Sequence, residues 1–148
     1  MKQSSNVISM GQHHNHGNQQ LIFMPRLYDE TMHLLVQSKN YFTLYCDEDQ
    51  KQLSPLQRLI YSAVMSRITL RLSMTLSWIM ARRAFHAGEL TEEELKEKYS
   101  LEYAEEHMEE SSYFDHFLPS FVRKLCEESR TLYSRIHALD NIQPYQPA

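Results

Sequence analysis

Among the residues that could support chemistry, Glu30 and His33 form a Glu-x-x-His motif. This spacing places two metal ligands on one face of a helix. A di-iron centre in a helical bundle needs two such motifs and two further inward-facing glutamates. The sequence has a single motif, and no acidic residue lies between Ser54 and Ala87. We therefore expect no metal site, and we place Glu30 and His33 on the surface.

The cysteines and the later histidines do not form a catalytic set. Cys126 has no histidine partner at helical spacing, and three acidic residues follow Cys46. Acidic neighbours raise the pKa of a thiol, which makes it a poor nucleophile. The later histidines are scattered and are expected to be surface or packing residues: His86, His107, His116 and His137. The prediction is a protein that is not an enzyme, with no catalytic residue and no cofactor.

The composition of the chain restricts its possible fold class and its possible partners. The chain has 148 residues and only 3 glycines, which is too few for phosphate-binding loops or for the turns of a β-sandwich. Abundant Leu, Met, Glu and Arg favour long helices, so an all-α single domain is predicted. The net charge of −4 argues against a nucleic-acid binder. The longest uncharged apolar run in the middle of the chain is Leu72–Ala81, and a membrane span needs about 20 residues. A cytoplasmic protein without a membrane anchor is therefore expected.

Three prolines mark the starts of the predicted helices, because proline is favoured at the first helical position. The helices are expected at 25–46, 55–87 and 119–139, in an antiparallel three-helix bundle with a long central helix. The bundle domain would span residues 21–140. The His/Asn/Gln-rich segment 1–20 is predicted to be a disordered tail, because it has too little apolar area to offset the entropy of ordering. Residues 141–148 would form a C-terminal tail.

The ends and the buried faces of these helices can also be read from the sequence. Ser54 and Gln57 form a capping box, and Gly88 stands where a glycine commonly ends a helix. The last helix carries an apolar stripe with alternating spacing of four and three. The stripe consists of Leu118, Val122, Leu125, Ser129, Leu132, Ile136 and Leu139.

The connector between the second and third predicted helices is acidic. Residues 89–110 hold ten of the 19 acidic residues and two of the 15 basic ones. Thr91 and Glu94 form a second capping box, so a short extra helix is expected to begin near Glu92. The acidic segment is either a solubilising connector or a docking surface for a basic partner.

The helix at 55–87 is apolar on almost every side, and two partner helices can cover only part of it. We therefore predict a homodimer in which this helix contributes to the interface. The residues expected in the core or dimer contact are Met65, Ile68, Leu72, Trp78 and Ile79.

Arginines interrupt this apolar helix and are the candidate partner-binding residues. Arg67, Arg71 and Arg82 fall in one sector of the helix, and Arg83 lies beside them. Each guanidinium could pair with acids of the first helix or of the acidic connector. Alternatively, the row could contact an anion or a partner protein.

Two stretches of the sequence are more specific than a generic bundle. The runs Met65–Leu72, Leu76–Ile79, Arg82–Phe85 and Gly88–Glu89 resemble the central helix of the regulator of CtrA degradation (RcdA-like) family. Residues Leu118–Pro119, Ser129, Leu132–Arg135 and Leu139–Asp140 are similar to the last helix of that family. The resemblance covers about 110 residues, from Leu27 to Asp140.

The resemblance implies a dimeric three-helix bundle that is a non-enzymatic adaptor. Members of that family help a ClpXP-type protease receive the cell-cycle transcription factor CtrA, together with a response-regulator adaptor and a cyclic-di-GMP-binding partner, at the cell pole. The alternative from another class is a helical sensor whose arginine row binds a small anion. A small metalloenzyme is a third and weaker alternative.

Overall fold

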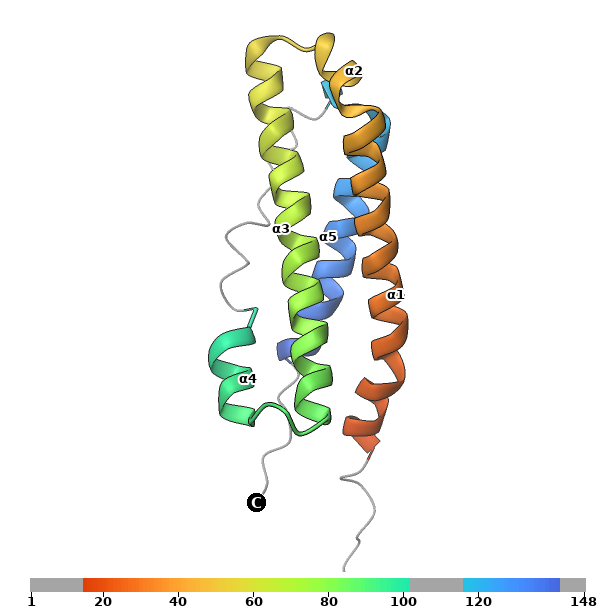
Figure 1. Ribbon diagram of the computed structural model, residues 1–148. Helices are drawn as coiled ribbons and strands as arrows, with labels where there is room; N and C mark the ends of the chain where they lie inside the picture. The colour runs from red at the N-terminus through yellow and green to blue at the C-terminus, as the bar shows by residue number, and fades with distance from the viewer. Residues whose placement is uncertain (1–14, 102–115, 142–148) are drawn as a thin grey trace, which may run out of the picture.

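The protein is a bundle of three long helices with two short ones, and the computed structural model describes residues 15–101 and 116–141. The long helices are α1 (Asn15–Leu44), α3 (Pro55–His86) and α5 (Ser120–Asn141); the short ones are α2 (Cys46–Lys51) and α4 (Glu92–Tyr99). The described residues contain no strand, so the all-α prediction is confirmed. Helix α2 caps the turn between α1 and α3, and α4 lies beside the C-terminal half of α3 (Figure 1).

The three long helices do not all alternate in direction. Helix α1 runs antiparallel to both α3 and α5, whereas α3 and α5 run parallel to each other (Figure 1). The contacts agree: Asp140 at the end of α5 bonds Trp78 near the end of α3. The described residues on the two sides of positions 102–115 therefore lie toward opposite ends of the bundle.

Helix α3 matches the sequence prediction closely. It was expected at 55–87 and spans Pro55–His86. The Ser54 Oγ accepts a hydrogen bond from the Gln57 N–H at 3.3 Å, and the Gln57 Oε1 accepts one from the Ser54 N–H at 2.9 Å. At the other end Gly88 has a φ of 76°, a left-handed conformation that glycine adopts without steric cost. The capping box and the terminal glycine were both predicted correctly.

Replacing Ser54 with alanine should lower the free energy of unfolding by about 1 kcal/mol, because an N-terminal backbone N–H of α3 loses its acceptor. Urea unfolding followed by circular dichroism measures this. The matched control is Ser134→Ala, an exposed serine inside α5, which should be neutral or slightly stabilising because alanine favours helix. Equal effects of the two substitutions would contradict the capping role.

Helix α1 differs from its prediction at both ends. It was expected at 25–46 but begins at Asn15, so residues 15–20 are helical and the predicted disordered tail 1–20 is wrong there; residues 1–14 lie outside the described part. Pro25 stands inside the helix. Extending an existing helix costs far less than starting one, and the buried Met24 anchors this extension. Residues predicted as a loop after Cys46 instead form α2, with three acidic residues in its first turn.

The core lies between the three long helices. Ile68, Leu72 and Ile79 of α3 are fully buried, as expected for the core of the central helix. The predicted stripe on α5 is buried from Leu118 to Ile136, with Leu139 partly buried against the core. Helix α4 starts at Glu92 behind its own capping box, again as predicted.

Candidate functional site

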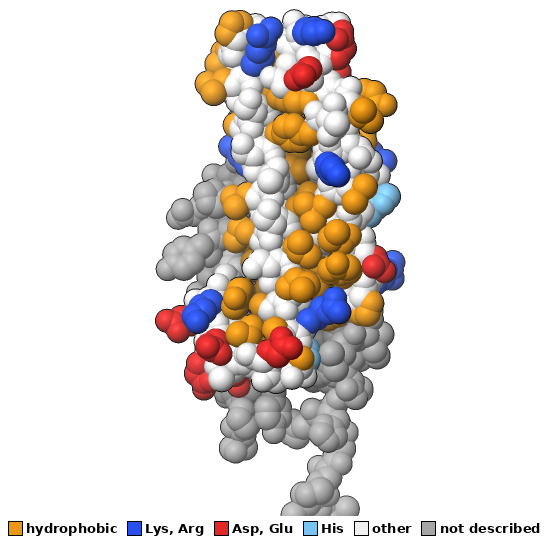
Figure 2. Space-filling view, in the orientation of Figure 1, with side chains coloured by type: hydrophobic (Ala, Val, Ile, Leu, Met, Phe, Trp, Pro, Cys, Tyr) orange, Lys and Arg blue, Asp and Glu red, His pale blue; other side chains and the backbone are white. Residues whose placement is uncertain are grey.

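Within residues 15–101 and 116–141, one side of α3 is left uncovered by the other helices. Its exposed apolar residues include Leu59 (68% exposed), Leu70 (41%) and Met80 (49%). Figure 2 shows hydrophobic side chains running along the face formed by α1 and α3, with most charged side chains near its ends and one basic side chain within its upper half. Large apolar side chains that are exposed together on a helical face are typical of protein-binding surfaces. The expectation that two partner helices cannot cover this helix agrees with its exposed face.

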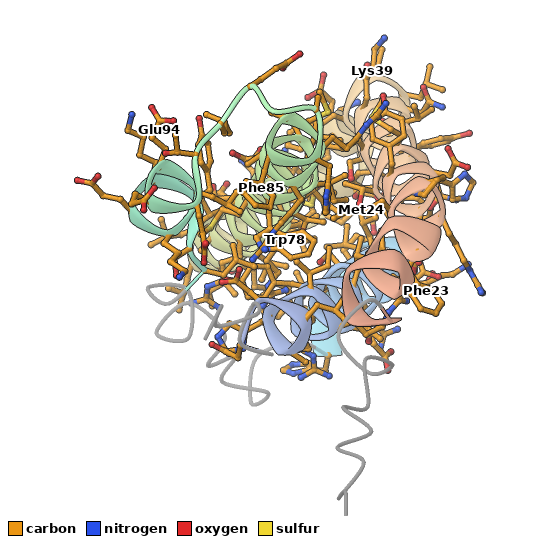
Figure 3. The ribbon with its side chains drawn as sticks, turned by 90° about the horizontal axis from the view of Figure 1, so that it is seen from below. Phe23, Met24, Lys39, Trp78, Phe85 and Glu94 are labelled. Atoms are coloured by element: carbon orange, nitrogen blue, oxygen red, sulfur yellow. The ribbon has the colours of Figure 1, made fainter. Side chains whose placement is uncertain are left out.

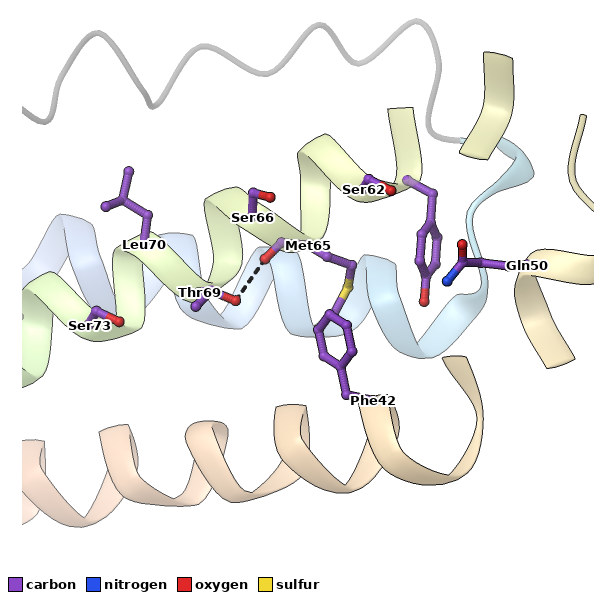
Figure 4. Close-up of a pocket in the computed structure, with 9 residues that line it drawn as sticks. Phe42, Gln50, Ser62, Met65, Ser66, Thr69, Leu70 and Ser73 are labelled. Atoms are coloured by element: carbon purple, nitrogen blue, oxygen red, sulfur yellow. Dashed lines mark hydrogen bonds between the residues drawn. The ribbon is translucent and has the colours of Figure 1, made fainter. Parts of the chain in front are cut away.

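A groove of about 570 Å³ opens on this face between α1 and α3. Phe42 reaches across from α1 toward Met65 of α3, and Leu70 stands at the solvent side (Figure 4). The other lining residues are Gln50, Tyr61, Ser62, Ser66, Thr69 and Ser73. The groove carries no charged side chain, so an uncharged apolar side chain is the chemical group that it fits. Phe42 is 49% exposed.

Beneath the groove, a chain of hydrogen bonds joins α1, α2 and α3. The Tyr61 hydroxyl donates to the Tyr41 hydroxyl at 2.9 Å, and the Tyr41 hydroxyl donates to Asp49 Oδ2 at 2.6 Å. Burial raises the pKa of Tyr41, and the bond to Asp49 raises it further. Burial likewise raises the pKa of Tyr61, with a contribution from its bond to Cys46. Both phenols therefore stay neutral, and they fix the geometry of the groove rather than supply a reactive group.

The predicted arginine row does not form one surface. Arg71 and Arg82 are buried, Arg67 is half-buried, and Arg83 is exposed. Arg71 Nη1 donates to the backbone oxygen of Cys126 at 3.4 Å. The guanidinium of Arg83 stacks over the ring of Tyr28 at 5.5 Å. Partner binding by these arginines stays a prediction, and Arg67 and Arg83 are the two with accessible side chains.

Asp140 is the residue that binds Arg82, and it joins three elements. Its Oδ1 accepts from Trp78 Nε1 at 2.7 Å and from Arg82 Nη2 at 3.0 Å, and its Oδ2 accepts from the Leu101 N–H at 3.0 Å. The guanidinium of Arg82 also lies 5.0 Å from the Trp78 ring. Trp78 points into the bundle, whereas Glu94 of α4 points outward (Figure 3). This cluster fixes the segment after α4 against the ends of α3 and α5.

The Glu30–His33 motif, which has the spacing of metal ligands, contacts neighbouring protein side chains instead. The Glu30 carboxylate receives two hydrogen bonds from Arg135 of α5, at 2.9 and 2.8 Å. His33 is exposed and contacts Gln37 at 2.9 Å. Within residues 15–101 and 116–141, no three His, Cys, Asp or Glu residues are grouped as metal ligands. In the same part of the chain no helix combines the length and the apolar character that crossing a membrane requires.

His86, at the end of α3, should make stability depend on pH. Burial lowers its pKa below the usual 6.5, and the nearby Arg82 lowers it further. The unfolded chain then binds a proton at a pH where the folded chain does not. The contribution of His86 is present above pH 6.5 and is lost as the pH falls.

The free energy of unfolding should therefore decrease between pH 7.5 and 5.5, and His86→Gln should reduce this slope. Urea titrations at the two pH values measure it. His33→Gln, at an exposed position on α1, should leave the slope unchanged. A slope that is the same in the wild type and in His86→Gln would rule out this assignment.

The sequence analysis did not identify Asp140 or Phe42 as residues of the candidate site. Asp140 was named only as part of the resemblance to a known family. No local pattern shows that it contacts Trp78, which lies 62 positions earlier in the chain. The one signal was the indole N–H of Trp78, which needs an acceptor when buried. Phe42 was missed because helical spacing alone does not show where α2 turns the chain.

Comparison with known proteins gives one result. A family model described as "Protein of unknown function (DUF1465)" matches residues 18–146. No curated protein and no solved structure matches the chain. The match spans nearly the whole chain, and the protein therefore belongs to the DUF1465 family.

Proposed function

We propose that the protein is a non-enzymatic adaptor of regulated proteolysis, which helps deliver a CtrA-like transcription regulator to a ClpXP-type protease. The observation that carries this proposal is the uncharged apolar face of α3 with its groove. Such a surface suits binding to another protein, and the residues that line the groove include no acid or base that would activate its hydroxyls. The resemblance of α3 and α5 to the regulator of CtrA degradation family supports the same function.

The adaptor is proposed to act as a homodimer in the cytoplasm, at the cell pole, together with a response regulator. A dimer presents every surface outside its own contact twice, so weak contacts add up through effective concentration. Light scattering should give a mass of about 35 kDa, twice the 17.6 kDa of one chain. A mass of one chain at micromolar concentration would reject the homodimer.

A reconstituted degradation assay tests the adaptor function. It combines a ClpXP-type protease, a response-regulator adaptor with its cyclic-di-GMP-binding partner, and a CtrA-like substrate. Adding the protein should shorten the half-life of the substrate at least several-fold. An unchanged half-life with all components present would reject the proposal.

Two matched variants show whether the α3 face is responsible. Leu70→Asp places a charge in the middle of the face, and it should abolish the acceleration while helicity is retained. Thr131→Asp places the same charge at an exposed position on α5 and should leave the acceleration intact. Loss of activity in both variants, or in neither, would argue against the α3 face as a contact that the adaptor function needs.

A further inference from the structure

The exposed face of α3 has the repeat of a coiled-coil seam. Seven exposed residues follow one another with spacings of four and three, as in a heptad repeat. None is charged, and no described helix of the chain packs over them. We call this set the α3 seam: Leu59, Ala63, Ser66, Leu70, Ser73, Ser77 and Met80.

The size pattern of the α3 seam reads the same in both directions. A large residue stands at each end and in the centre, with two small residues in each interval. A parallel two-fold contact pairs every position with itself and needs no such symmetry. An antiparallel contact pairs Leu59 with Met80 and Ser66 with Ser73, so this pattern sets large residues against large ones and small residues against small ones. Leu70 then lies at the two-fold axis.

We propose that two copies of the chain pair through the α3 seam in antiparallel orientation, with Leu70 of each copy at the centre. This inference rests on the proposed homodimer and names its contact. The small residues beside Leu70 allow the two helices to approach closely. The groove opens at the same level, since Ser66, Leu70 and Ser73 all line it, so the Leu70 side chain of the second copy can enter it.

Charges at the two ends of the bundle fit this orientation. Arg83 is exposed near the C-terminal end of α3, on the side of α1, where it stacks over Tyr28. Asp47 and Glu48 are exposed on α2, at the opposite end of the bundle and also on the side of α1 (Figure 1). Antiparallel pairing brings Arg83 of one copy toward these acids of the other. Two basic residues lie at that end too. Lys51 Nζ pairs with Glu48 Oε2 at 2.7 Å, which leaves Asp47 as the acid for Arg83, and Arg58 Nε donates to the Gln50 backbone oxygen at 3.0 Å.

The helix dipoles favour the same orientation. Each end of a helix carries a partial charge, positive at the N-terminus and negative at the C-terminus. Antiparallel α3 helices place opposite ends together, whereas parallel helices place like ends together.

Cysteine cross-linking tests the orientation. Ser66→Cys and Ser73→Cys are prepared separately in the full chain, one of them with a mass tag, and are oxidised alone and as a mixture. The native Cys46 and Cys126 are buried and stay in place, with the wild type as background. In the antiparallel dimer, residue 66 faces residue 73, so the mixture should cross-link at least tenfold more than either variant alone. Two copies of residue 66 would lie about 10 Å apart along the axis, beyond disulfide reach.

The possible outcomes separate this inference from the proposed homodimer. Efficient cross-linking of Ser66→Cys with itself would overturn the antiparallel register and leave the homodimer standing. A dimeric mass with no cross-linking above Thr131→Cys, an exposed control on α5, would overturn the α3 seam as the contact. A monomeric mass would overturn both.

Discussion

Replacing Asp140 with alanine should lower the free energy of unfolding by about 3 kcal/mol or more, since losing one partner of a buried ion pair leaves the other charge uncompensated. Asp140 and Arg82 have side chains only 9% exposed each. The substitution also leaves the indole N–H of Trp78 and the backbone N–H of Leu101 without their acceptor. Urea unfolding at fixed protein concentration measures the effect.

The ion pair between Glu30 and Arg135 provides the matched control. It has good bidentate geometry, but its side chains are 36% and 46% exposed. Surface pairs contribute about 0–1 kcal/mol, so Glu30→Ala should cost far less than Asp140→Ala. Asp140→Asn should fall between them, because an amide oxygen can still accept the two hydrogen bonds made to Oδ1, whereas the amide NH₂ cannot accept from the Leu101 N–H. Similar costs for Glu30→Ala and Asp140→Ala would contradict the central place given to Asp140.

Replacing Leu72 with alanine should destabilise the fold by about 2–5 kcal/mol, the usual range for a buried leucine that leaves a cavity. Leu72 is completely buried in the middle of α3, where α1 and α5 both pack and the space cannot collapse easily. Thermal and urea unfolding should agree in direction.

Leu56→Ala is the control for this core substitution. Leu56 lies on the same helix, is 64% exposed and precedes the first residue of the α3 seam by three positions. Its replacement should change stability by no more than about 0.5 kcal/mol, as is usual for surface sites. If Leu56→Ala were as costly as Leu72→Ala, the first turn of α3 would have to be covered by a contact that the single chain does not show.

Local signals in the sequence predicted the fold well where the structure depends on neighbouring residues. Ser54 and Gln57 are three positions apart and set the start of α3, and Gly88 ends it. The spacing of Leu125 and Leu132 marks the buried side of α5. Such features depend on helical geometry, which is the same in every protein.

The sequence predicted less where the result depends on contacts between distant segments. Helix α1 extends to Asn15 because a helix that has already formed can lengthen through polar residues at little cost. Those residues carry no helical signal of their own, so the sequence did not predict the extension. The parallel course of α3 and α5 depended on how a long connector returns. Arg82 was expected to find an acid on the first helix or in the acidic connector, and its partner is Asp140 on α5. Several acids lay within reach in principle, and periodicity does not choose between them.

The position of Trp78 gives the protein an internal optical probe. It is the single tryptophan of the chain, and its indole N–H is bonded to Asp140 while Arg82 stacks near its ring. Its emission spectrum therefore reports directly on the junction of α3, α5 and Leu101. Intrinsic fluorescence can follow that junction during unfolding or partner binding without any added label.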